Sequence, residues 1–183
     1  MAQAMEKTRS SSAGDKDSDL QTLFYDTLKD IYFAEKHILK ALPKMAKAAQ
    51  ASELTEAFET HMEQTEGQVA RLEQVFDIIG KAARGKTCDA IIGILDEGKE
   101  VMDEYKGSDA LDAGLLAAAQ AVEHYEISRY GTLKAWAMKL GYNDAAKLLD
   151  ETLAEEKETD VLLTKIAKSA VNDEGMTKTG KNK

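Results

Sequence analysis

Acidic residues lie on or beside the apolar stripes of three predicted amphipathic helices, and they restrict the folds that this chain can adopt. These residues are Glu35, Glu123, Glu126, Glu155 and Glu156. A soluble helical bundle normally has leucine or alanine at such positions. Burying several carboxylates together is strongly unfavourable unless cations neutralise them. The sequence therefore predicts a helical bundle that encloses a site for cations.

Apolar residues recur with a helical period over four long segments and one short segment. The chain of 183 residues contains a single proline, so little interrupts these segments. Predicted helices cover about residues 18–50, 52–79, 90–105, 110–140 and 144–171. The first two and the last two long helices are joined by short turns, and the connection between the pairs contains the short helix. The expected fold is therefore all-α, a ferritin-like four-helix bundle with one long crossover.

Local signals indicate where the domain and its helices begin and end. Ser18 followed by Gln21 forms a capping box, Ser52 is the expected N-cap of the second helix, and Gly141 ends the fourth. Pro43 lies inside the first helix and predicts a kink. The residues outside these segments lack a helical period. Residues 1–17 and 172–183 are therefore expected to be disordered tails around one domain, 18–171.

The charge of the chain argues against some classes of function. The formal net charge is −9, of which residues 1–17 contribute zero and residues 172–183 contribute +1, so the body carries −9 minus +1, or −10. Such a body is a poor surface for direct nucleic-acid binding. The single cysteine, Cys88, cannot form an internal disulfide, and no segment has the pattern of a signal peptide or a membrane span. A cytoplasmic protein is expected.

The glutamates share a direction as well as a residue type. At 100° per residue, Glu126 lies at the centre of its apolar stripe, Glu123 lies about 60° away, and Glu35 lies within about 40° of its own stripe. Glu155 and Glu156 flank the stripe of the last helix, one on each side. A single glutamate at such a boundary can also reach solvent along its own stem. The repetition on three helices favours the inward orientation.

Height along the bundle gives a second criterion. Glu35 lies about 24 Å from the first turn, while Glu126 and Glu156 lie about 24 Å and 21 Å from the second turn. These counts predict that the carboxylates meet in one layer. Two divalent cations would largely offset the charge of five carboxylates, and an imidazole or water would complete the coordination.

The second helix offers a less complete set of ligands. His61 faces inward, but it lies only about 15 Å from the first turn, which is roughly 9 Å out of the predicted layer. A metal ligand and a core histidine bonded to a carboxylate are both consistent with its position. Gln64 flanks the same stripe, where a glutamate would have supplied another anion.

Three other residues receive simpler interpretations. His37 and His124 fall on polar faces and are expected to be solvated or to lie at an oligomer contact. Tyr130 lies one turn beyond Glu126 on the same face. A hydrogen-bond donor to a metal ligand, a redox-active ring and a packed core tyrosine remain alternatives for it.

Several short motifs carry a family resemblance. They are DIYFAEK at 30–36, ALPK at 41–44, AFETH at 57–61, VEHYEI at 122–127, YGTL at 130–133, EEK at 155–157 and TD at 159–160. Over about residues 20–171 they resemble the YciF-like branch of the ferritin-like superfamily. The resemblance implies a bundle that forms a homodimer, a rubrerythrin-like centre of two iron or manganese ions, and a part in bacterial stress responses. Members of this branch often carry a glutamate where this chain has Gln64.

Two functions from different classes follow. The first is a di-iron or di-manganese protein that handles O₂ or peroxide, with its status as an enzyme left open. The second is a non-catalytic, oligomeric stress or structural module whose metal site is partly dismantled, as Gln64 and the height of His61 suggest. A ferritin-type storage cage would require an assembly of many subunits.

Overall fold

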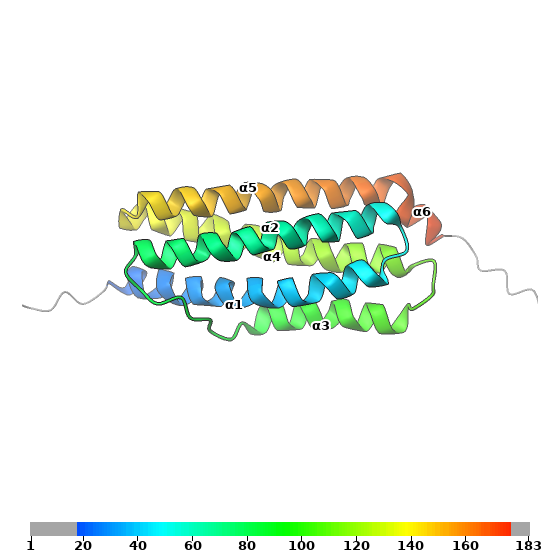
Figure 1. Cartoon of the computed structure of the whole chain (residues 1–183), viewed down its shortest axis with the longest axis horizontal. Helices are drawn as coiled ribbons and strands as arrows, with labels where there is room; N and C mark the ends of the chain where they lie inside the picture. Colours follow the sequence, from blue (N-terminus) through cyan, green and yellow to red (C-terminus); the bar gives the residue numbers. More distant parts are fainter. Residues whose placement is uncertain (1–17, 177–183) are drawn as a thin grey trace, which may run out of the picture.

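Five helices of 16 to 30 residues run side by side through the described part of the chain, residues 18–176 of a computed structural model (Figure 1). They are α1 (Asp19–Ala48), α2 (Ser52–Ile78), α3 (Asp89–Glu104), α4 (Leu111–Leu140) and α5 (Asn143–Ile166). A π-helical segment, η1 (Ala167–Val171), and the short α6 (Asn172–Glu174) follow. The prediction of an all-α protein is confirmed.

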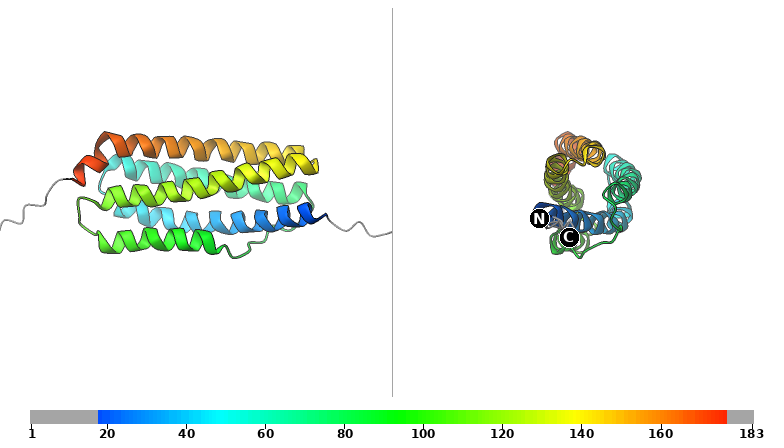
Figure 2. Two further views of the ribbon diagram at one scale, coloured as in Figure 1. Left: turned by 180° about the vertical axis from the view of Figure 1, so that it is seen from behind. Right: turned by 90° about the vertical axis from the view of Figure 1, so that its left-hand side faces the viewer.

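The connectivity is that of two hairpins joined by a crossover. A short turn links α1 to α2 at one end of the bundle, and another links α4 to α5 at the opposite end (Figure 1). The end view in Figure 2 shows these four helices surrounding a common interior, with α3 outside them. The helix of the crossover, α3, packs against α4 and α1. The predicted four-helix bundle with a short extra helix is therefore confirmed.

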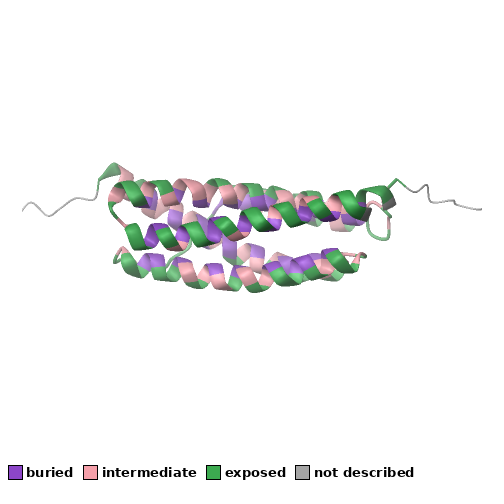
Figure 3. Cartoon of the chain, turned by 90° about the horizontal axis from the view of Figure 1, so that it is seen from above, coloured by how far each residue is buried: buried purple, intermediate pink, exposed green. Residues whose placement is uncertain are grey.

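Buried residues line the inner faces of the helices, as the distribution of purple in Figure 3 shows. Large apolar side chains such as Phe24, Leu28 and Phe76 are almost fully buried. A layer of polar residues interrupts this core: Glu35, His61, Thr65, Gln68, Glu123, Glu126, Thr152, Glu156 and Thr159 are all buried. None of the described helices combines the length and the apolar character that crossing a membrane requires.

Two of the predicted helix ends are confirmed by their hydrogen bonds. The backbone N–H of Gln21 donates to the Ser18 hydroxyl at 3.2 Å, and the Ser18 N–H donates to the Gln21 side chain at 2.7 Å. This is the expected capping box at the start of α1. Gly141 ends α4 with φ of 82°, in the left-handed region that glycine adopts without steric penalty.

The prediction that Ser52 caps α2 is wrong. The N-cap is Ala51, which has no side-chain acceptor. A carboxylate from α4 serves this turn instead: Asp112 accepts hydrogen bonds from the N–H groups of Gln50 at 2.9 Å and Ala51 at 2.6 Å. Asp112 is buried. The turn between α1 and α2 is thus held by a residue that no local pattern indicates.

The last helical segments differ slightly from the prediction. Helical structure continues beyond residue 171, since α6 covers Asn172–Glu174, and the domain bounds 18–171 remain a prediction. The α-helical geometry ends at Ile166 and gives way to η1. Residues 1–17 and 177–183, where tails were expected, lie outside the described residues. Helix α1 continues through Pro43, and the kink there remains a prediction.

Candidate metal centre

Each of the four main helices places at least one buried ionisable side chain in the interior of the bundle. Glu35 comes from α1, His61 from α2, Glu123 and Glu126 from α4, and Glu156 from α5. Glu123 and Glu126 are three residues apart, so they lie on one face of α4. All five residues have a relative exposure of 3% or less. We refer to these five residues as the acidic cluster.

The acidic cluster is compact. Ligand atoms of His61, Glu123, Glu126 and Glu156 all lie within 4.8 Å of one another. The Nε2 atom of His61 lies 3.4 Å from Oε1 of Glu123. Glu35 lies next to Glu126. The two carboxyl groups are near enough to share a hydrogen bond when one of them is protonated. The group of four could therefore hold a metal ion, and Glu35 lies beside it.

The polar atoms of the acidic cluster are largely without partners. Both carboxyl oxygens of Glu126 and of Glu156 have no hydrogen-bond donor in the described part of the chain, and neither does one oxygen of Glu35 and of Glu123. Such atoms are rare in folded proteins because each loses its hydration on burial. Oxygen ligands of this kind are what a divalent cation requires, so the residues present fit a metal site.

The electrostatics agree with this geometry. Burial raises the pKa of Glu35 to about 7 and that of Glu123 to about 8. Burial, together with the neighbouring carboxylates, holds the pKa values of Glu126 and Glu156 well above their usual range. The pKa of His61 is lowered to about 4 by burial, so its imidazole is neutral at pH 7. A neutral imidazole is the form that binds a metal ion.

Tyr130 supports the acidic cluster from one side. Its ring is fully buried, and its O–H donates a hydrogen bond to Oε1 of Glu35. Burial and the nearby carboxylates keep the pKa of this phenol well above its usual value, so the group remains a donor. The sequence left three interpretations of Tyr130 open. The structure shows that Tyr130 is a hydrogen-bond donor to Glu35, a residue of the acidic cluster.

The structure does not bring Glu155 into the acidic cluster, contrary to its predicted place in the site. Arg71 of α2 forms a bidentate ion pair with its carboxylate, and the amide of Gln68 donates to the same group at 3.1 Å. The side chain of Glu155 is 26% exposed. Consecutive helical residues point about 100° apart, so Glu155 and Glu156 cannot both face the centre.

The predicted offset in height of His61 is also wrong. The turn after α1 and the turn after α4 lie at opposite ends of the bundle (Figure 1). In a bundle of about 45 Å, His61 at about 15 Å from one end is about 30 Å from the other, and Glu123 lies about 28 Å from that same end. The two residues are therefore level, as their 3.4 Å contact requires.

The remaining sequence candidates lie outside the acidic cluster. His37 stacks on Phe33 and bonds to its carbonyl oxygen at 2.8 Å, while His124 is exposed and lies 3.2 Å from Asp160. Gln64 is half-buried, and its side chain accepts a bond of 3.5 Å from Thr159. The sequence patterns did not identify Arg71 and Gln68, which bind Glu155. Both lie on the inward side of α2, where a polar side chain needs a hydrogen-bond partner.

Residues 19–176 match the protein family described as Domain of unknown function (DUF892). The chain belongs to this family. Among known proteins, this DUF892 member is similar to Protein YciF of Escherichia coli strain K12. The two are 46% identical over 155 residues, which make up 84% of this chain and 93% of YciF. The resemblance to the YciF-like branch that the motifs indicated is confirmed.

Solved structures give the same relationship for this DUF892 member. The crystal structure of the Escherichia coli stress protein YciF has a TM-score of 0.81 and 43% identity, covering 85% of this chain and 99% of that one. YcfI of Rhodopseudomonas palustris, described as a candidate structural protein, has a TM-score of 0.78 and 43% identity. The similarity covers 83% of this chain and 96% of the YcfI chain.

Proposed function

We propose that this protein holds two iron or manganese ions in the acidic cluster and handles O₂ or peroxide with them. The observation that carries the proposal is the set of buried carboxyl oxygens without hydrogen-bond donors on Glu35, Glu123, Glu126 and Glu156. These four carboxylates carry −4 when ionised, which two divalent cations balance. The fifth predicted carboxylate, on Glu155, is balanced by Arg71 instead. Imidazole and carboxylate ligands together suit iron and manganese.

The chain would prepare such a site in three ways. His61 would supply a neutral nitrogen, and the glutamates would supply carboxylate oxygens from three helices. Tyr130 orients Glu35 through its hydrogen bond. The apolar residues around the acidic cluster limit the access of water. Two ions bound here would supply electrons to O₂ or peroxide.

The biological setting is proposed from the relatives. The Escherichia coli relative is a stress protein by its description, so we place this protein in a stress response as well. A homodimer in the cytoplasm is the proposed form, and the buried, free thiol of Cys88 fits a reducing compartment.

A second candidate function is a non-catalytic structural or stress module. It draws on the description of YcfI as a candidate structural protein and on Gln64, which stands where another anion was expected. In that case the carboxyl groups would hold protons in place of metal ions, which their raised pKa values permit.

Metal analysis separates the two candidates. The protein is purified without chelator and its iron and manganese content is measured by mass spectrometry, beside that of Glu126→Ala and a control, Glu151→Ala. Glu151 carries a side chain that is 61% exposed, lies outside the acidic cluster, and forms a long ion pair of 3.8 Å with Arg71. We expect about two ions per chain in the parent and the control, and a marked loss in Glu126→Ala. Negligible metal in the parent, unchanged by Glu126→Ala, would refute the proposal.

A further inference from the structure

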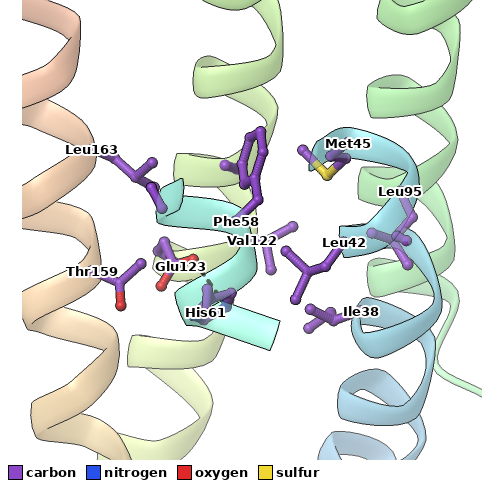
Figure 4. A pocket seen from close by; sticks show the side chains of 13 residues that line it. Ile38, Leu42, Met45, Phe58, His61, Leu95, Val122, Glu123, Thr159 and Leu163 are labelled. Carbon is purple, nitrogen blue, oxygen red and sulfur yellow. Dashed lines mark ion pairs between the residues drawn. The ribbon is translucent and has the colours of Figure 1, made fainter. Parts of the chain in front are cut away.

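A small cavity adjoins the acidic cluster on the side nearer the turn between α1 and α2. Its volume is about 20 Å³, and its lining includes Ile38, Leu42, Phe58, Val122 and Leu163. Figure 4 shows His61, Glu123 and Thr159 together at one end of it, and apolar side chains of α1 and α3 at the other. The cavity thus joins two residues of the acidic cluster to an apolar space.

A second cavity of about 20 Å³ lies between α1, α3 and α4. Apolar side chains and one glycine, Gly98, line it throughout. Ala41, Met45, Leu95 and Val122 belong to the walls of both cavities. These four side chains are therefore the partition between them. The two cavities form an interrupted apolar path that runs from the acidic cluster toward α3, the helix outside the four-helix core (Figure 2).

The size and the lining of the first cavity restrict what can occupy it. One water molecule needs a space of roughly 10–15 Å³, so about 20 Å³ admits a molecule of one or two heavy atoms and excludes an organic substrate. Water also needs two to four polar partners, and hydrogen peroxide likewise loses hydrogen bonds in an apolar space. The surface exposed to the cavity is almost entirely apolar, and the polar residues of its lining, His61, Glu123 and Thr159, are confined to one end. A small apolar molecule is favoured over either of them.

We infer that this cavity is a binding site for dioxygen, which reaches the acidic cluster beside His61 and Glu123 by the apolar path from α3. The inference rests on the proposed function, and it narrows the oxidant to O₂. Met45, Leu95 and Val122 control passage along the path, since their side chains separate the two cavities. The inference concerns where O₂ binds and is independent of the number of metal ions.

The first test needs no metal. Methyl-labelled, metal-free full-length protein is placed under oxygen pressure, and the paramagnetic relaxation that O₂ causes is measured by NMR. Nitrogen at the same pressure is the control. We expect the methyl groups of Leu42 and Leu163 to relax several-fold faster than those of Leu133 and Leu149, which are also buried but do not line the cavity. Equal relaxation in the two sets would overturn the inference, whatever the metal content.

The second test fills the cavity. Ala119 lines it and is buried, and Ala119→Val adds two methyl groups to the space. Ala146 is buried to the same extent on α5 and serves as the matched control, Ala146→Val. The rates at which O₂ and hydrogen peroxide oxidise the iron-loaded protein are compared after metal content has been checked.

We expect Ala119→Val to slow oxidation by O₂ several-fold and to leave both the peroxide rate and the metal content unchanged. The control should change neither rate. If both oxidants are slowed alike, or neither is, the assignment to O₂ is wrong. A parent protein without metal would refute the proposed function, whereas the relaxation experiment alone decides whether the cavity takes up O₂.

Discussion

The carboxyl group of Glu126 faces three others, those of Glu35, Glu123 and Glu156. Burial raises its pKa most, and all three neighbours raise it further. Neither of its oxygens receives a hydrogen bond in the described part of the chain. With a cation present, this position is the centre of a ligand set. Without one, it is a source of repulsion that either a proton or a substitution can remove.

Replacing Glu126 with glutamine should therefore have opposite effects on metal binding and on stability. We expect Glu126→Gln to lose much of its metal and, as metal-free protein at pH 8, to be more stable than the parent by about 1–4 kcal/mol. Denaturant unfolding measures the difference. The exposed Glu151→Gln should stay within about 0.5 kcal/mol of the parent. A metal-free Glu126→Gln that is less stable than the parent would contradict this account.

Tyr130 allows a second test at the level of single atoms. Removing its hydroxyl in Tyr130→Phe leaves Glu35 without its donor, so metal affinity should fall about tenfold or more, as for other partners of metal ligands. Competition with a chelator measures the affinity. Tyr25→Phe is the control, because its hydroxyl bonds to a carbonyl oxygen at the exposed surface. Equal affinities of Tyr130→Phe and the parent would show that Glu35 needs no such support.

Among the helices, the turn between α1 and α2 depends on α4. Asp112→Ala removes the acceptor for the N–H groups of Gln50 and Ala51, and such a loss costs about 1–3 kcal/mol. We expect a drop of that size in the free energy of unfolding, and faster amide exchange at Gln50 and Ala51. The control, Asp103→Ala, changes an exposed residue of α3. Unchanged exchange at the turn would mean that other contacts hold it.

This turn also shows which parts of the fold the sequence could predict. Ser18 and Gln21 cap α1 within three residues, and Gly141 ends α4 through its own backbone, so both ends could be read locally. The acceptor at Ala51 comes from a residue 61 positions away. A serine at position 52 satisfied the local pattern, but the distant carboxylate determined the geometry.

The acidic cluster was predictable to a similar degree. Helical periodicity identified the inward faces that carry Glu35, Glu123 and Glu126. It could not separate Glu155 from Glu156, which flank one stripe, because the pairing of Glu155 with Arg71 depends on how α2 and α5 are placed in space. The predicted height of His61 fails for a related reason. The two turns lie at opposite ends of the bundle, so heights counted from them can be compared only when the length of the bundle is known.

At the scale of the whole molecule, the acidic cluster links folding to pH. Between pH 6.5 and 8 the folded, metal-free chain still binds part of the protons of Glu35 and Glu123, whose pKa values are about 7 and about 8. The unfolded chain has already released them, since an unperturbed glutamate has a pKa of about 4.3. The folded state therefore binds more protons, and its stability decreases as pH rises through this window.

His61 acts in the opposite direction but over a different range. Its pKa is lowered to about 4, so between pH 4 and about 6.5 the unfolded chain binds the extra proton at this residue, and the contribution of His61 alone to stability rises with pH. Measurements above pH 6.5 thus isolate the carboxyl groups. In that range, each carboxyl group that remains protonated can lower the free energy of unfolding by at most about 1.4 kcal/mol per pH unit.

We therefore expect the metal-free protein to unfold more readily at pH 8 than at pH 6.5 in denaturant titrations, and Glu126→Gln to show a weaker dependence because one of the interacting carboxyl groups is gone. Bound metal should abolish or reverse the trend, since it displaces the protons and its affinity increases with pH. Metal-free protein that is equally stable at both pH values would show that the acidic cluster relaxes toward water when it lacks a cation. In that case the bundle would need metal to hold the helices at their present separation.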